Sequence, residues 1–380
     1  MPTFYEFFAG GGMARLGLGS DWTCLFANDI DVQKAASYNA NHGVNALTCK
    51  DIHDVTAAEL PGVVDLRWGS FPCQDLSRAG ARAGLNAARS GTFFPFWDLV
   101  AGLAREDRTP RVVALENVCG TLTSRGGRDF AAICETFAKF GYRYGPLIIN
   151  ANLFLPQSRP RLFMIGVRED VAIAPELIAS GPRGQFHPEE LRRAMRMVSP
   201  AAQADAVWWA LPTPPKRRTR FADLIESEPK GVAWHSTTQT SRLLALMTPL
   251  HRAKIAAAQR TGRREVGGIY RRTRVDATGA KVQRAEIRFD DLAGCLRTPA
   301  GGSSRQTVMV VEGSRIRSRL LSARETARLM GLPDDYVLPV RYNEAYHLTG
   351  DGVAVPVVGH LARYLLEPLL GLTGAARSAA

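Results

Sequence analysis

The chain has 380 residues, of which 46% are hydrophobic, and it carries a formal net charge of +12 at pH 7. This length supports a sizeable core divided between two domains. No apolar run is long enough to cross a bilayer, the N-terminus lacks a secretory signal, and the six cysteines show no C-x-x-C spacing. We therefore expect a protein that is neither membrane-spanning nor secreted, without a metal site or a disulfide framework.

Short apolar runs alternate with helical patterns over the first 170 residues. We expect strands at residues 4–9, 24–27, 46–49, 63–68, 112–115 and 162–167, and helices at 13–18, 31–43, 96–106 and 130–140. Such alternation is typical of a Rossmann-like α/β fold, in which helices cover both faces of a mostly parallel sheet. Ligands bind these sheets at the carboxyl ends of the strands.

A glycine-rich turn at residues 8–12 (Phe-Ala-Gly-Gly-Gly) follows the first expected strand. Bare backbone amides at such a turn favour a phosphate or carboxylate, and a purely structural turn is the alternative. Asp29 ends the second strand, where an acidic side chain commonly binds ribose hydroxyls. Asp51 ends the third and can accept from an adenine amino group, although either aspartate can instead cap a helix. A nucleoside that carries an amino acid would satisfy all three sites.

Cys73 follows the fourth expected strand and stands behind Pro72, which restricts the local backbone. A thiol acts as a nucleophile only as the thiolate, which requires nearby positive charge or helix amides. Taken alone, a single cysteine is more often a small buried hydrophobe. The choice between these readings therefore depends on the other motifs.

An acid and two arginines complete the candidate chemistry. Glu116 follows the apolar strand 112–115, where burial would keep its carboxyl protonated. Gln157, Arg159 and Arg161 alternate and would project to one side of an extended segment. We expect Arg161 to face a substrate carbonyl and the thiolate, and Arg159 to support the acid. The structural alternatives are a surface ion pair for Glu116 and solvated arginines on an edge strand for Arg159 and Arg161.

Positive charge is concentrated in residues 171–310, which contain 23 Lys or Arg against 12 Asp or Glu, while the rest of the chain contains 25 against 24. Periodicity is weak there, so we expect a smaller, irregular second domain. The charge predicts nucleic acid as the partner, with a solvated basic face as the alternative. The basic run at 216–220 fits a phosphate-contacting loop better than a nuclear address.

The pattern becomes regular again after residue 320. Ser322 and Glu325 form a capping box at the start of a helix. Glycines at 350 and 352 indicate a turn, and the apolar helix at 357–370 requires a partner surface. We expect the first domain to supply that surface, so that the chain returns to it.

Taken in order, these segments resemble the motifs of the DNA (cytosine-5)-methyltransferases of the restriction–modification or phage type. Residues 8–12 resemble the cofactor loop, Pro72-Cys73-Gln74 the catalytic loop, Glu116-Asn117-Val118 the acid motif, Gln157-x-Arg159-x-Arg161 the arginine motif, 298–302 the end of the recognition domain, 319–336 the late helical motif and 350–356 the final motif. The individual motifs are weak or moderate, but their ordered set is highly specific and runs nearly end to end.

The resemblance implies a Rossmann-like S-adenosylmethionine-dependent methyltransferase domain at 1–170, a target-recognition domain at 171–310 and a return segment at 311–375. It implies S-adenosyl-L-methionine as cofactor and, as substrate, a cytosine flipped out of double-stranded DNA. Cys73 would add to C6, Glu116 would stabilise or protonate N3, C5 would accept the methyl group, and Arg161 would hold the base.

The implied site residues form three groups. The catalytic group is Cys73, Glu116, Arg161, Arg159 and Gln157; the cofactor group is Phe8, Gly10, Gly12, Asp29, Ile30, Asp51, Ile52, Pro72 and Asp351. The third group consists of DNA contacts that we expect from the basic region: Lys216, Arg217, Arg218, Arg271 and Arg272 as phosphate contacts, together with Ser303 and Arg305.

Three positions depart from the family pattern. Leu76 replaces the usual phenylalanine, a conservative apolar change, and Ile30 stands where many relatives stack an aromatic ring on adenine. Asp351-Gly352 replaces the usual Asn followed by Ala or Ser. An altered preference for the sulfonium donor is a hypothesis that follows from this last change.

The leading hypothesis is a sequence-specific DNA cytosine-C5 methyltransferase, cytoplasmic and of bacterial or phage origin. We expect it to act as a monomer on DNA, with a cognate restriction endonuclease as a candidate partner. The alternatives are a tRNA cytosine-C5 methyltransferase and a catalytically silent DNA-binding regulator of the same fold. The sequence does not indicate which bases are recognised.

Overall fold

The computed structural model describes residues 1–71, 91–276, 278–297 and 305–372. The chain divides into two compact units. Unit 1 comprises residues 1–150, 160–214 and the segment from 352 onward, and unit 2 comprises 151–159 and 215–351. Pro72, Cys73, Leu76, Ser303 and the segment 298–302 lie outside the described residues.

The unit boundaries differ from those expected from the sequence. The first domain was expected to end at residue 170, but unit 1 continues to residue 214. The chain was expected to return to the first domain at residue 311, but it re-enters unit 1 at residue 352. At the first boundary, the segment after residue 171 pairs with a strand of unit 1. Tyr144 donates its amide to the carbonyl of Asp205 at 3.0 Å and accepts from the amide of Val207 at 2.7 Å. Backbone pairing between such distant residues leaves no local signal in the sequence.

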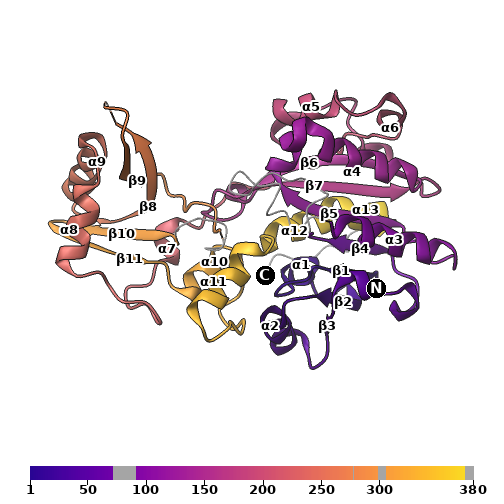
Figure 1. Ribbon diagram of the computed structural model, residues 1–380, viewed down its shortest axis with the longest axis horizontal. Helices are drawn as coiled ribbons and strands as arrows, with labels where there is room; N and C mark the ends of the chain where they lie inside the picture. The colour runs from indigo at the N-terminus through magenta and orange to yellow at the C-terminus, as the bar shows by residue number, and fades with distance from the viewer. Residues whose placement is uncertain (72–90, 277, 298–304, 373–380) are drawn as a thin grey trace. The chain divides into compact units, whose positions relative to one another are not determined.

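Unit 1 is built on a seven-stranded sheet of order β3-β2-β1-β4-β5-β7-β6 (Figure 1). Its strands are β1 (Thr3–Phe7), β2 (Thr23–Asp29), β3 (Thr48–Cys49), β4 (Leu66–Gly69), β5 (Val112–Val118), β6 (Tyr142–Asn150) and β7 (Pro160–Arg168). The pairings from β3 to β5 are parallel, whereas β7 runs antiparallel to β5 and β6. The expected mostly parallel sheet is confirmed.

Helices cover both faces of this sheet. They are α1 (Met13–Leu18), α2 (Val32–His42), α3 (Phe93–Ala104), α4 (Arg128–Lys139), α5 (Glu189–Met195) and α6 (Pro200–Ala204). Glu6 of β1 reaches α2, since Tyr38 donates its hydroxyl to the Glu6 carboxyl at 3.0 Å. Phe7, the next residue of β1, points to the opposite face and contacts Phe96 of α3 with ring centroids 5.6 Å apart. The period of two along a strand therefore directs Glu6 and Phe7 to helices on opposite faces of the sheet.

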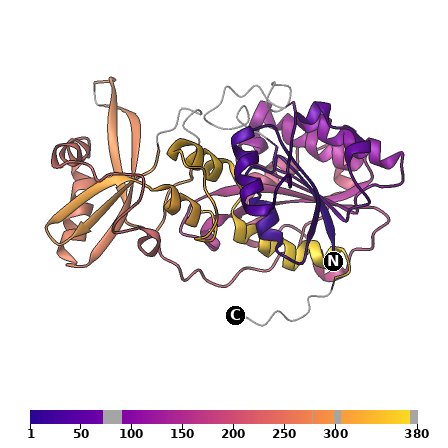
Figure 2. The same ribbon diagram turned by 90° about the horizontal axis from the view of Figure 1, so that it is seen from below.

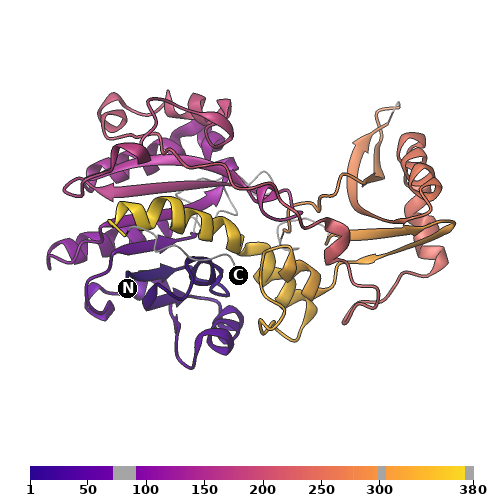
Figure 3. The ribbon, with the colours of Figure 1, turned by 180° about the vertical axis from the view of Figure 1, so that it is seen from behind.

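The C-terminal helix returns to unit 1 as expected. It consists of α12 (Val355–Leu361), a π-helical turn (Ala362–Leu366) and α13 (Glu367–Leu369), which form one continuous rod (Figure 3). Gly17 of α1 is the close contact with α12, because a Cβ at that position would lie 2.4 Å from the Cβ of Val358. The partner surface expected for this apolar helix is thus α1.

Strand β6 was not expected, because Gly145 and Pro146 interrupt its apolar pattern. A neighbouring segment leaves no room for a side chain at position 145. A Cβ there would lie 2.4 Å from the carbonyl oxygen of Val207, and the buried Trp209 donates its indole N–H to the Gly145 carbonyl at 3.1 Å. The close approach of two backbones explains a residue that otherwise argues against a strand.

Unit 2 contains a four-stranded antiparallel sheet of order β11-β10-β8-β9. Its elements are α7 (Phe221–Leu224), α8 (Thr237–Ala245), α9 (Pro249–Arg260), β8 (Arg264–Val275), β9 (Lys281–Arg288), β10 (Thr307–Glu312), β11 (Arg315–Leu320), α10 (Ala323–Arg328) and α11 (Tyr342–Asp351). The expectation of an irregular second domain is therefore wrong. In β8, the consecutive glycines at 267 and 268 and the consecutive arginines at 271 and 272 interrupt the alternation of apolar and polar residues from which strands are recognised.

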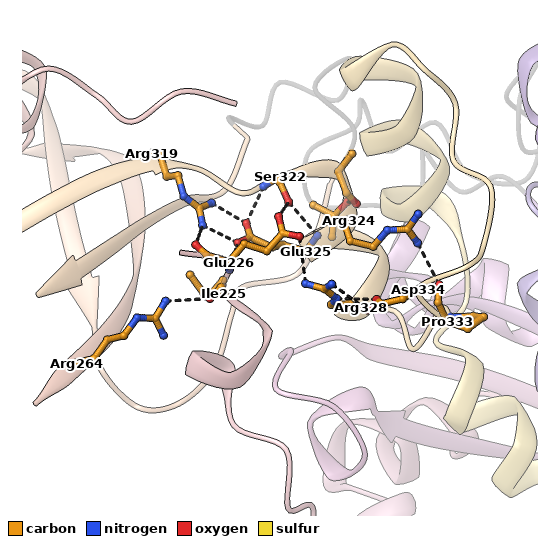
Figure 4. A network of polar contacts seen from close by, with 12 residues as sticks. Ile225, Glu226, Arg264, Arg319, Ser322, Arg324, Glu325, Arg328, Pro333 and Asp334 are labelled. Atoms are coloured by element: carbon orange, nitrogen blue, oxygen red, sulfur yellow. Dashed lines mark hydrogen bonds and ion pairs between the residues drawn. The ribbon is translucent and has the colours of Figure 1, made fainter. Parts of the chain in front are cut away.

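A buried polar network joins α10 to the sheet of unit 2 (Figure 4). Ser322 caps α10 by accepting from the amide of Glu325, which confirms the expected capping box. The carboxylate of Glu325 accepts from both terminal nitrogens of Arg319 at 2.6 and 2.7 Å, and both side chains are fully buried. The carboxylate of Glu226 also accepts a hydrogen bond from the Ser322 hydroxyl at 2.8 Å. The network fixes the direction in which the chain leaves β11.

In the part of the chain that the structure describes, every helix is too short or too polar to cross a membrane.

Candidate active site

The carboxyl edge of the sheet in unit 1 collects most of the residues proposed from the sequence. The loop after β1 begins at Phe8, β2 ends at Asp29, and Asp51 follows β3. Glu116 lies near the end of β5, and Arg161 lies near the start of the antiparallel β7, directly opposite Val118. Because β7 runs the other way, its first residues share an edge with the last residues of the parallel strands.

The glycine-rich loop is held by Asp29. Its Oδ2 accepts from the amide of Gly10 at 2.8 Å, and its Oδ1 accepts from the amide of Asp31 at 2.9 Å. Phe8, Gly10 and Gly12 all have positive φ values, of 56°, 56° and 74°. The loop therefore needs glycine at two positions, and it holds Phe8 in a conformation that costs energy for a residue with a side chain.

Three other proposed cofactor residues follow the ends of strands β2 and β3. Ile30 follows Asp29 and is 65% exposed, whereas Ile52 is buried. Asp51 caps a short 3₁₀ turn by accepting from the amide and ring of His53 at 3.0 and 2.7 Å, and these bonds hold the pKa of its carboxyl below the usual value. The capping alternative for Asp51 is therefore realised. Its second oxygen leaves capacity for another donor.

The acid and one arginine form a nearly buried ion pair. Glu116 Oε1 and Arg161 Nε lie 2.9 Å apart, and the exposed fractions of the two side chains are 8% and 14%. The structure thus places Arg161 against the carboxyl, a role that we expected of Arg159. The reason is the register of β5 and β7, which sets Arg161 opposite Val118 and keeps it beside the acid.

Gln157 and Arg159 are both buried and belong to unit 2. Arg159 donates to the carbonyls of Leu296 at 3.1 Å and Gly350 at 2.8 Å. Gln157 donates to the carbonyl of Leu329 at 2.6 Å and accepts from the amide of Leu296 at 3.3 Å. These contacts tie the segment 151–159 to the later part of the chain, and both side chains reach the backbone of Leu296.

Two further residues lie near Glu116: Asn117, which belongs to the acid motif and is expected to orient the neighbouring backbone, and Cys119, which the sequence did not single out. Asn117 is buried, accepts from the amide of Val118 at 2.8 Å, and its Nδ2 finds no partner among the described residues. Cys119 lies where the charges of Arg161 and Glu116 act on its thiol, and burial raises its pKa to about 11. The signal available in the sequence was their position directly around the expected acid motif.

The candidate DNA contacts fall in unit 2, which contains 26 Lys or Arg against 14 Asp or Glu, while unit 1 contains 22 against 22. Lys216, Arg218, Arg271 and Arg272 are exposed. Arg217 is instead engaged internally, with Asp291 Oδ2 at 3.0 Å from its Nη1. Arg305 is half-buried and donates to the side chain of Asn343 at 2.5 Å. Asp351 is exposed at the end of α11, also in unit 2.

Two solved structures share the architecture. The Entamoeba histolytica methyltransferase EhMeth has a TM-score of 0.61 at 12% identity, with 99% of each chain covered. The Schizosaccharomyces pombe Dnmt2 methyltransferase has a TM-score of 0.56 at 19% identity, with 97% of this chain and 99% of that chain covered. At these identities the likeness concerns the fold.

The sequence comparisons identify the family. Type II methyltransferase M.HpaII of Haemophilus parainfluenzae is 27% identical over 387 residues, covering 97% of this chain and 90% of the relative. Type II methyltransferase M.BsuFI of Bacillus subtilis is 26% identical over 370 residues, covering 97% and 73%. The sequence model described as C-5 cytosine-specific DNA methylase matches residues 2–367. Because this match spans nearly the whole chain, the protein belongs to that family and is a DNA (cytosine-5) methyltransferase.

Proposed function

We propose that the protein transfers a methyl group from S-adenosylmethionine to C5 of a cytosine in a specific sequence of double-stranded DNA, with Cys73 as the nucleophile. The observation that carries this proposal is the ion pair of Glu116 and Arg161 at the carboxyl edge of the sheet. An acid and a guanidinium held side by side suit a pyrimidine, which presents a ring nitrogen beside a carbonyl oxygen.

The residues around the glycine-rich loop fit an adenosine-containing cofactor. Phe8 and the exposed Ile30 offer apolar surface for a base, while Asp29 and Asp51 offer carboxylate oxygens for hydroxyl and amino donors. Gly10 leaves open space where another residue would place a Cβ. S-adenosylmethionine supplies an electrophilic methyl group when bound. Asp351 stays a proposed contact, and its effect on donor preference stays a hypothesis.

The chemistry assigned to the chain begins at sulfur. The Cys73 thiolate adds to C6 of a flipped cytosine, while Glu116 stabilises the ring at N3 and Arg161 holds the carbonyl edge. The ring electrons displaced towards C5 would form the new carbon–carbon bond with the methyl group, while the bond from that methyl group to the sulfonium sulfur would break and leave its electron pair on sulfur as a neutral thioether. A base then removes the C5 proton, the C5–C6 double bond is restored, and the thiolate leaves. Flipping is required because C5 and C6 are inaccessible in a stacked duplex.

The type II relatives support a place in restriction–modification. On that basis we propose a cognate endonuclease that cleaves the same sequence, action as a monomer on DNA, and a cytoplasmic location in a bacterial or phage-infected cell. The basic unit 2 supports target recognition, since it carries the whole net charge of the chain.

Methyl transfer with radiolabelled S-adenosylmethionine tests the proposal, with duplex DNA and tRNA as parallel substrates. We expect label in DNA, located at one cytosine of a short sequence by bisulfite sequencing. DNA containing 5-fluorocytosine at that position should give an adduct that survives denaturant. Label in tRNA alone, or DNA binding without label or adduct, would overturn the proposal in favour of a tRNA enzyme or a silent regulator.

A further inference from the structure

The outer half of the β8–β9 hairpin extends beyond the rest of the sheet in unit 2 (Figure 2). Strand β8 pairs with β10 only from Arg264 to Ile269, whereas its pairing with β9 continues to Val275. Residues 271–275 are exposed. We call residues 270–275 and 281–286 the distal ribbon, because they pair with each other and, within the described part of the chain, with no third strand.

Alternation divides the distal ribbon into two faces. Ile269, Ala285 and Ile287 belong to the hydrophobic core under α8 and α9, so Arg271, Thr273 and Gln283 continue that face outward. The opposite face carries Tyr270, Arg272, Arg274, Arg284 and Glu286. We call this the arginine face.

The arginine face contains a local electrostatic conflict. Arg272 lies directly opposite Arg284 in the register, and like charges in such a pair destabilise a sheet. Glu286 is the carboxylate that compensates within the ribbon: it contacts Arg272 Nε at 3.3 Å and Arg274 Nη2 at 2.5 Å. Glu286 and the nearby Asp276, which lies just beyond the ribbon and feels the charge of Arg284, are thus two carboxylates beside three guanidinium groups, which leaves an excess of positive charge. Folding of the ribbon does not by itself require this excess of positive charge. Binding of a polyanion would relieve the repulsion between the guanidinium groups.

Glu286 also controls the direction of these arginines. Its side chain is 21% exposed, whereas Arg272 and Arg274 are about half exposed, at 52% and 50%. Glu286 Oε1 accepts from both Nε and Nη2 of Arg274, at 2.7 and 2.5 Å. These two bonds use Nε and one hydrogen of Nη2, so Nη1 and the second hydrogen of Nη2 are not engaged by Glu286.

We propose that the distal ribbon enters the major groove of DNA and that Arg272 and Arg274 read guanine there, held in position by Glu286. This assignment rests on the proposed DNA methylation and names the residues that select its target. The major groove is about 12 Å wide and admits a two-stranded ribbon, and an arginine fork pairs with the O6 and N7 acceptors of guanine. Arg272 is thus a base reader and not the phosphate contact we expected from the sequence.

The experiment measures methylation across a pool of duplexes with randomised positions around the target cytosine, read by bisulfite sequencing. The variants are Arg274→Lys and Glu286→Gln. Lysine keeps the charge but not the fork, so Arg274→Lys should lower the preference for guanine at one position by about tenfold or more while DNA binding keeps its salt dependence. Glu286→Gln should weaken the same preference.

Gln283→Ala provides the matched control on the other face. It removes a cross-strand hydrogen bond to Thr273 of 2.8 Å, and it should leave the preference unchanged. If Arg274→Lys and Glu286→Gln slow methylation of all sequences by one factor, or leave the preference intact, the ribbon assignment is wrong although the enzyme remains a DNA methyltransferase. If the unaltered protein methylates no DNA, the proposed function itself fails.

Discussion

At the residue scale, the surroundings of Cys119 help to decide which cysteine is the nucleophile. It lies beside the Glu116–Arg161 pair, but burial is the main influence on it and raises its pKa to about 11. At neutral pH this thiol stays protonated and is a poor nucleophile. Proximity to the ion pair is therefore insufficient to make Cys119 the attacking group.

We expect Cys73→Ser to lower the methylation rate by at least about 1,000-fold, because it removes the nucleophile. Cys119→Ser should keep the rate within about threefold, since it exchanges one protonated group for another. Single-turnover rates with labelled cofactor measure both. Equal losses in the two variants would contradict the assignment of Cys73.

Glu6 is a buried acid beneath the glycine-rich loop. Burial is the largest influence on its carboxyl and raises its pKa from 4.5 to about 7, against the opposing bonds from Tyr38 and from the amide of Arg15 at 3.3 Å. Between these two pH values the folded protein keeps a proton that the unfolded chain releases. The free energy of unfolding contributed by Glu6 therefore falls as pH rises through this window.

Glu6→Gln should remove this fall. Relative to the unaltered protein, the variant should gain about 3 kcal/mol in the free energy of unfolding between pH 4.5 and pH 7.5, measured by urea denaturation. His42 acts in the opposite sense, because burial lowers its pKa to about 4, but it is present in both proteins and cancels in the difference. Parallel pH profiles for the two proteins would show that Glu6 ionises normally.

At the scale of elements, the Arg319–Glu325 pair connects β11 to α10. Both side chains are fully buried, so neither charge is stabilised by water if its partner is lost. Arg328 and Asp334 form a contrasting pair in the same network, with Asp334 mostly exposed. Exposed pairs contribute little to stability.

Glu325→Ala should lower the free energy of unfolding by about 3–5 kcal/mol, because it leaves the Arg319 guanidinium buried without its carboxylate. The control Asp334→Ala should cost less than about 1 kcal/mol. Urea denaturation of both variants measures the difference, and the double variant Arg319→Met with Glu325→Leu should recover part of the loss. Similar costs for the two single variants would contradict the role given to the buried pair.

At the scale of the whole molecule, net charge separates the two units. Unit 1 is neutral by count, and unit 2 carries the full excess of positive charge. Phosphate contacts release counterions, so affinity falls with salt in proportion to their number. Lys216 and Arg218 remain the exposed candidates in the basic run, because Arg217 is occupied by Asp291.

We expect Lys216→Ala and Arg218→Ala each to weaken binding to all DNA sequences alike and to lower the slope of log K against log salt by about 1. Lys139→Ala, an exposed lysine of unit 1, should leave the slope unchanged. Binding titrations at several salt concentrations measure the slopes. A changed sequence preference in either unit 2 variant would instead make that residue a base reader.

The sequence alone determined the features that depend on neighbouring residues. The strand–helix order of the first half, the Asp31 cap of α2 and the Ser322 capping box of α10 were all predictable, because periodicity and capping act within a few residues. The family was predictable as well, since its motifs occur in order along the chain. The positions of Glu116 and the glycine-rich loop at strand ends were also predictable, because the strands that lead to them have local apolar patterns.

Tertiary structure alone decided which distant residues meet. It paired Arg161 with Glu116, placed β6 beside residues 206–209, and formed the sheet of unit 2. It also buried Arg67 between the rings of Phe7 and Phe96, 4.2 and 4.1 Å from their centroids, without a hydrogen-bond partner among the described residues. These outcomes depend on strand register and on packing between segments far apart in the chain, which no local pattern records.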